Sequence, residues 1–141
     1  MVANGYVKTY RSNAVLTASP GQLVLMLYDG ALKAMAIAIE AFERPEDDTG
    51  RIQVINHQLQ KAQNIIAELQ NGLNLEAGGD FAQTLFRLYD YHNRRLFEAN
   101  LKKDVAIIHE VDNLVRSLRD AWAEMLTKQE EPHTESLRGV A

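Results

Sequence analysis

The 141-residue sequence contains no cysteine, which excludes disulfide bridges, thiolate metal sites and a cysteine nucleophile. It also lacks a basic surplus. The net charge is -4 at pH 7, which argues against nucleic acid as a partner, because nucleic-acid binding needs a basic surface. The longest apolar runs, 23–28 and 34–39, are far shorter than the ~20 residues that span a bilayer, and the N-terminus has no apolar signal core. We therefore expect a cytoplasmic protein without membrane insertion.

The residues that are present predict an all-α protein. Hydrophobic residues make up 46% of the chain and charged residues 24%, as in one globular domain. No strand pattern of period two occurs, whereas helical spacing of apolar residues predicts four helices, at 20–43, 51–74, 81–100 and 105–128. Their short connections predict an antiparallel four-helix bundle over 17–128. We expect a mobile N-terminal arm over 1–16, containing a short cap helix, and a disordered tail over 129–141.

Local signals mark the helix ends. Ser19 and Gln22 have the spacing of a capping box, with Pro20 at the first helical position. Asp80 and Asp104 are the predicted caps of the third and fourth helices. Within the first helix, Asp29 and Lys33 have the i,i+4 spacing that predicts an ion pair on its narrow polar stripe. The first helix is apolar on nearly every other side.

Apolar rows predict which faces meet in the bundle. The expected inner rows are, on the second helix, Ile52, Ile55, Leu59, Ala62, Ile66, Leu69 and Leu73; on the third, Phe81, Leu85, Leu88, Leu96 and Ala99; and on the fourth, Ile107, Val111, Leu114, Leu118, Ala121 and Met125. The fourth helix carries a second row of Ile108, Val115, Trp122 and Leu126. This surplus, with that of the first helix, leaves two interpretations: all of it packs internally, or part of it forms a groove for an amphipathic partner helix.

Residues suited to catalysis or metal binding are scarce. The one Glu-x-x-His motif, at Glu130–His133, contains Pro132, so its side chains cannot share a helical face. His92 lies on an apolar face, where we expect a hydrogen-bonded core histidine. We predict no catalytic residues, no cofactor, no metal and no enzymatic activity. Two alternatives remain open: a metal- or cofactor-binding helical enzyme, supported by the fold and His92, and a structural bundle that self-associates.

Several sequence blocks resemble the FliS family of flagellar secretion chaperones. They are Tyr10, Thr17-Ala-Ser-Pro20, Leu23, Met26-Leu-Tyr-Asp-Gly30, Lys61-Ala-Gln63, Ile65-Ile66, Glu68-Leu69, Leu73, Leu88-Tyr-Asp-Tyr91, Arg94-Arg-Leu96, Ala99-Asn100 and Arg119-Asp-Ala-Trp122. They occur in the family's order and cover about residues 6–126. The loop 44–50 is more acidic than expected for the family, and the tail after Lys128 has no recognised counterpart.

The resemblance implies a function in bacterial flagellum assembly. Such chaperones are helical bundles without enzymatic activity that act in the bacterial cytosol. They bind the C-terminal segment of flagellin, prevent its premature polymerisation and aid its delivery to the flagellar export apparatus through type III export. The family's N-terminal segment can cover part of the binding surface. A docked arm or a homodimer would likewise hide exposed apolar surface. The predicted partner-binding residues are Tyr6, Tyr10, Val15, Leu16, Leu23, Tyr28, Ile108, Val115, Trp122 and Leu126.

Overall fold

The computed structural model describes residues 18–129, and these form four helices. In chain order the helices are α2 (Pro20–Phe42), α3 (Arg51–Asn71), α4 (Gly79–Lys102) and α5 (Val105–Gln129). No strand occurs between residues 18 and 129. The prediction of an all-α four-helix bundle is therefore confirmed. The predicted arm at 1–16 and nearly all of the predicted tail lie outside the described residues.

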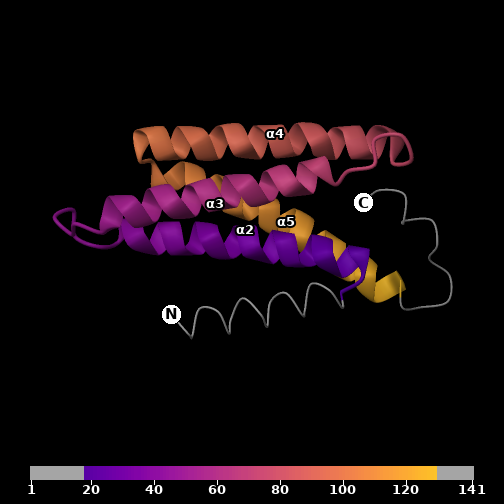
Figure 1. The fold of residues 1–141 in the computed structure, drawn as a ribbon, viewed down its shortest axis with the longest axis horizontal. Helices are drawn as coiled ribbons and strands as arrows, with labels where there is room; N and C mark the ends of the chain where they lie inside the picture. Colours follow the sequence, from indigo (N-terminus) through magenta and orange to yellow (C-terminus); the bar gives the residue numbers. More distant parts are fainter. Residues whose placement is uncertain (1–17, 130–141) are drawn as a thin grey trace.

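Each helix packs on its neighbours in the chain, and α5 closes the bundle by packing on α2. α2, α3 and α4 run alongside one another in alternating directions, whereas α5 crosses behind them from the end of α4 to the start of α2 (Figure 1). The start of α4 and the end of α5 consequently diverge at one end of the bundle. This divergence leaves the apolar residues there partly uncovered.

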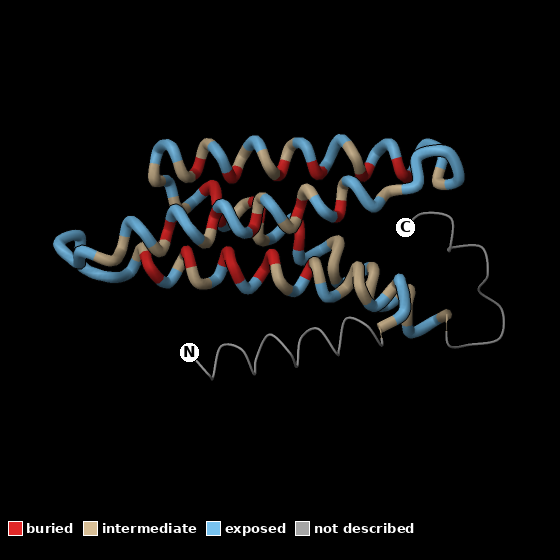
Figure 2. The backbone as a smooth tube through the Cα atoms, viewed as in Figure 1, coloured by how far each residue is buried: buried red, intermediate tan, exposed pale blue. Residues whose placement is uncertain are grey.

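One continuous core joins the inward faces of all four helices, as the buried segments in Figure 2 show. The α3 row is buried from Ile55 to Leu69, as predicted, but Ile52 at its start is 43% exposed. On α4 the predicted inward positions of Phe81 and Leu88 are wrong, because these side chains are 57% and 37% exposed. They lie on the half of α4 that diverges from α5, so no helix covers them.

The predicted α5 rows are only partly correct, because Ile107 and Val111 of the expected inner row are buried as predicted, but the core also includes part of the second row. Ile108 and Val115, in the expected second row, are fully buried, whereas Leu114 in the expected inner row is 39% exposed. The reason is the crossing of α5: as it leaves α4 for α2, the row that faces the core changes. The row of Ile108 and Val115 therefore belongs to the core and not to a surface groove.

The helix ends follow the sequence in most places. Ser19 caps α2 in a complete capping box: its Oγ accepts from the Gln22 amide at 3.2 Å, and its own amide donates to Gln22 Oε1 at 3.2 Å. The Asp104 carboxylate accepts from the Ala106 amide at 3.0 Å at the start of α5, as predicted. The predicted cap at Asp80 is wrong, because α4 begins earlier, at Gly79, and Asp80 lies in its first turn.

Replacing Ser19 by Ala is expected to lower the free energy of unfolding by about 1 kcal/mol, because the Gln22 amide loses its acceptor. Urea unfolding followed by circular dichroism measures the change. The control is Ser117→Ala in α5, where the hydroxyl only donates to the Asn113 carbonyl within the helix. An equal effect of both substitutions would contradict a specific capping role for Ser19.

α2 is the most apolar helix of the bundle. By length and composition alone it could cross a membrane, with a mean hydropathy of 1.5, but the core helix of a soluble protein passes the same test. In this fold its inner face, including Tyr28, Met35 and Ala38, is buried in the core. Leu23, Met26, Leu27 and Ile37 of α2 line a groove beside α3.

Candidate functional site

An open apolar groove lies between α2 and α3, with a volume of about 790 Å³. We name it the α2–α3 groove. It is lined from α2 by Leu23, Met26, Leu27, Asp29, Gly30, Lys33, Ala34 and Ile37, and from α3 by Gln58, Lys61, Ile65 and Glu68. Met26 is 38% exposed, so its side chain is accessible from the groove. The groove therefore has the apolar surface and the flanking charges that an amphipathic helix requires.

Gly30 sets the depth of the groove at its centre. A Cβ atom at this position would lie 3.3 Å from Ile65 Cδ1, tighter than an ordinary van der Waals contact. Because Gly30 has no side chain, the tip of the Ile65 side chain can lie close to the α2 backbone at this point. The groove floor is thus formed by backbone and by the half-buried side chain of Ile65.

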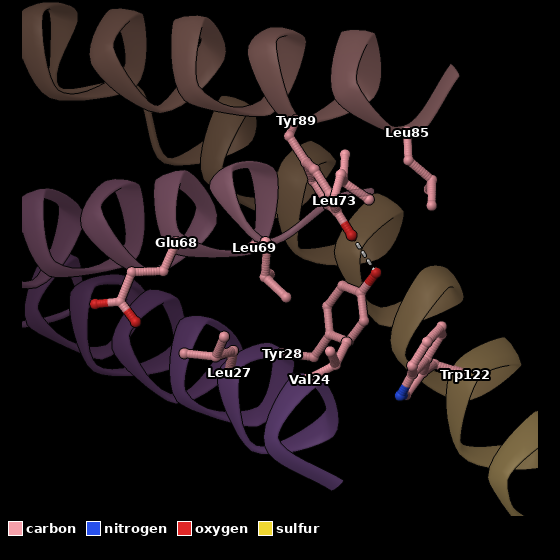
Figure 3. Close-up of a pocket in the computed structure, with 10 residues that line it drawn as sticks. Val24, Leu27, Tyr28, Glu68, Leu69, Leu73, Leu85, Tyr89 and Trp122 are labelled. Carbon is pink, nitrogen blue, oxygen red and sulfur yellow. Dashed lines mark hydrogen bonds between the residues drawn. The ribbon is translucent and has the colours of Figure 1, made fainter. Parts of the chain in front are cut away.

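A smaller cavity of about 50 Å³ adjoins the groove at the start of α2 (Figure 3). All four helices and the connection after α3 contribute to its lining, which consists of Val24, Leu27, Tyr28, Glu68, Leu69, Gly72, Leu73, Leu85, Tyr89 and Trp122. Leu27 and Glu68 line both spaces, so the end cavity borders the groove at these two residues. The volume of the end cavity, about 50 Å³, suits one small aliphatic group.

Two tyrosines meet beside the end cavity. The hydroxyls of Tyr28 and Tyr89 are hydrogen-bonded across the bundle and point toward each other in Figure 3. Both residues are 2% exposed, and burial raises the pKa of each phenol. Both phenols are therefore neutral at physiological pH, and the pair joins α2 to α4. Nearby, Trp122 Nε1 donates to the Gly21 carbonyl at 2.8 Å and joins α5 to α2.

The charges beside the groove differ from the predicted pairing. Asp29 Oδ1 bonds Arg119 Nε of α5 at 2.8 Å, so the predicted Asp29–Lys33 pair is not formed. This contact raises the pKa of Arg119. Among residues 18–129, Lys33, Lys61 and Glu68 make no ion pair within 4 Å. These three exposed groove charges are available to a partner.

A second polar cluster joins α4 to α5 away from the groove. Arg95 Nε and Nη2 donate to the two carboxylate oxygens of Glu110 at 2.9 and 3.0 Å, and Tyr91 also donates to Glu110. The Arg95 guanidinium and the Tyr91 hydroxyl lower the pKa of the Glu110 carboxyl. Every polar group of this cluster is engaged within the protein, so we assign it to helix packing.

His92 is the buried polar residue of the core, at 1% exposure. Its predicted core position is confirmed, but its Nδ1 atom has no hydrogen-bond partner. Burial lowers its pKa to about 4, although the Glu110 carboxylate opposes this shift. No group of three or more His, Asp or Glu residues within the described chain could hold a metal ion.

The predicted partner-binding residues fall into distinct places. Tyr6, Tyr10, Val15 and Leu16 lie outside the described residues. Leu23 lines the α2–α3 groove, and Trp122 lines the end cavity. Leu126 is half-buried, and its Cδ2 would lie 2.5 Å from a Cβ atom at Gly21, so it packs where α5 meets the start of α2. Tyr28, expected on an exposed part of its helix, is instead buried, as are Ile108 and Val115.

Sequence reasoning missed the α3 wall of the groove. Ile65 and Val54 lie off the main α3 row, and Ile65 proves to be a groove residue. The sequence predicted Lys33 only as the partner of Asp29 and Lys61 only as part of a family block, and neither as a groove residue, because charged residues on an amphipathic helix usually meet solvent. Their place beside a common groove depends on how α2 and α3 pair.

Comparisons with known proteins match nearly the whole chain. The family model described as "Flagellar protein FliS" matches residues 2–130. The chain is 41% identical over 128 residues to the flagellar secretion chaperone FliS of Bacillus subtilis, covering 91% of the chain and 90% of that protein. It is 40% identical to the protein of the same name from Salmonella typhimurium, covering 87% and 88%, and 39% identical to that from Escherichia coli, covering 86% of each.

Proposed function

This chain belongs to the flagellar protein FliS family and is a flagellar secretion chaperone, and we propose that its α2–α3 groove binds the C-terminal segment of flagellin. The observation that carries the proposal is the groove itself, which shares Leu27 and Glu68 with the end cavity. A flagellin helix would lay its apolar face in the groove, and one of its aliphatic side chains would enter the cavity.

The energetics of such a client favour this kind of surface. A segment that is disordered before binding loses conformational entropy when it folds on the chaperone, and a long apolar contact must offset that loss. The groove supplies the contact without reaction chemistry. We further propose that the bound chaperone prevents premature flagellin polymerisation in the bacterial cytosol, aids delivery to the export apparatus and catalyses no reaction. Residues 1–16 would cover part of this surface when no client is bound.

A charge placed in the groove is expected to weaken client binding. Met26→Glu should reduce the affinity for a flagellin C-terminal peptide by about tenfold, because the carboxylate must lose water in an apolar contact. Isothermal titration calorimetry with the full chain measures the affinity, and circular dichroism checks that the variant remains helical.

The matched control is Leu101→Glu, because Leu101 is 73% exposed on α4 and does not line the groove. Its substitution should leave the affinity unchanged. Absence of saturable binding to the unmodified, folded protein would refute the proposed flagellin site. Equal weakening by the two variants would move the site away from α2 and α3.

A further inference from the structure

Acidic and basic side chains lie toward opposite ends of the α2–α3 groove. Ile65 Cδ1 lies beside Gly30, where an added Cβ atom would be 3.3 Å from it, and this placement gives the register of the two antiparallel helices. Glu68 lies three residues beyond Ile65, about 4.5 Å toward the start of α2 at 1.5 Å per residue. Lys61 lies four residues before Ile65, and Lys33 three residues after Gly30, so both are displaced about 4.5–6 Å toward the other end. The groove thus has an acidic end and a basic end.

This separation is not neutralised inside the protein. Lys33, Lys61 and Glu68 form no ion pairs among residues 18–129, although Arg95, Lys102 and Arg116 on other faces all do. The nearest other carboxylate of the groove, Asp29, is bonded to Arg119. The two lysines therefore present positive charge to whatever lies in the groove, and Glu68 presents negative charge.

An α-helix also has a dipole along its axis. Its N-terminus carries a partial positive charge and its C-terminus a partial negative charge, and acidic side chains in the last turn increase the negative charge there. An anionic helix C-terminus is favourable beside Lys33 and Lys61 and unfavourable beside Glu68. The reverse orientation would place like charges together at both ends.

We infer that the α2–α3 groove accepts its client helix in one direction only, parallel to α2. The helix N-terminus lies beside Glu68, and its last turn, carrying Asp or Glu side chains, lies over Lys33 and Lys61. The occupant is an amphipathic helix of the flagellin C-terminal segment, so the inference rests on the proposed function. The apolar floor supplies affinity, whereas the charges set the orientation.

Spin labels test the direction directly, because the chain contains no cysteine of its own. Gln53→Cys and Asn71→Cys place single nitroxides on exposed positions near opposite ends of α3, about 27 Å apart along the helix. Neither residue lines the groove. With a ¹⁵N-labelled flagellin C-terminal peptide bound, the label at 53 should broaden the resonances of the last turn of the groove-bound helix. The label at 71 should broaden those of its first turn.

Charge reversal provides an independent measurement. Lys33→Glu and Lys61→Glu should each weaken peptide binding by about two- to fivefold at low salt, and the effect should shrink as salt is added. The matched control is Arg87→Glu on the exposed face of α4, which should leave the affinity unchanged. Calorimetry at two salt concentrations provides both comparisons.

The outcomes separate this inference from the function on which it rests. The exchanged broadening pattern would overturn the stated direction while flagellin binding stands. Tight binding without broadening by either label would place the peptide outside the groove, and this result would also overturn the inference. The groove would then be left to a second copy of the chain or to residues 1–16. No binding to the unmodified protein would overturn the proposed flagellin site and the orientation together.

Discussion

Acidification from pH 7 to pH 4 is expected to lower the free energy of unfolding by about 3 kcal/mol through His92 alone. His92 is 1% exposed, and its Nδ1 atom lacks a hydrogen-bond partner. The rings of Tyr89 and Tyr91 lie 6.1 and 6.3 Å from its ring. Burial therefore disfavours the imidazolium and lowers the pKa from 6.5 to about 4, while the Glu110 carboxylate partly opposes this shift.

The sign of the effect follows from which state binds the proton first. The unfolded chain protonates His92 below its ordinary pKa of 6.5, whereas the folded protein keeps it neutral until about pH 4. Stability therefore falls as the pH drops from 6.5 toward 4, and this loss is complete below pH 4. The interval of 6.5 to about 4, at 1.36 kcal/mol per pH unit, gives the expected value of about 3 kcal/mol.

Urea unfolding between pH 7 and pH 4 measures this loss, and His92→Phe should abolish it. Glu110→Gln is the comparison variant, because the pKa of the Glu110 carboxyl is itself lowered and contributes at the acidic end. In Glu110→Gln the carboxylate charge is absent but His92 stays buried. The decrease in the free energy of unfolding below pH 6.5 should therefore persist in this variant. An unchanged pH profile for His92→Phe would contradict the assignment to this side chain.

The Tyr28–Tyr89 hydrogen bond is expected to give a strongly non-additive pair of mutations. Tyr28→Phe or Tyr89→Phe alone should each cost about 1–3 kcal/mol, because the remaining hydroxyl is buried without a partner. The double substitution removes both hydroxyls and should cost clearly less than the sum of the single changes. A coupling of about 1–2 kcal/mol is expected.

A double-mutant cycle in urea unfolding provides this coupling energy. Tyr91→Phe is the control, because its hydroxyl donates to Glu110 at 2.8 Å in a partly exposed contact and should cost less than either buried tyrosine. Strictly additive losses for Tyr28 and Tyr89 would show that the hydroxyls do not depend on each other. Because the pair borders the end cavity, the double variant also tests whether its polar group affects client affinity.

The candidate site was only partly predictable, for reasons that particular residues make clear. The apolar surplus of the first helix left open whether it packs internally or forms a partner surface, and Leu23, a predicted binding residue, lines the groove. Tyr28 belongs to the same apolar stretch, but its hydroxyl finds Tyr89, 61 positions later, and it is buried. Asp29 has Lys33 at an ideal helical spacing, yet it bonds Arg119, 90 positions away. Local spacing cannot show such distant competitors.

By itself, the sequence determined the four helices, their approximate ends, the capping box at Ser19 and the family, because helical periodicity, caps and sequence blocks are local properties. The tertiary structure alone decided which apolar face became core and which remained exposed. The crossing of α5 buried Val115 and uncovered Leu114, and the close approach at Gly30 brought Lys33 and Lys61 to one end of a groove. The physical reason is that the rotation and crossing of a helix are set by how its side chains pack against its neighbours.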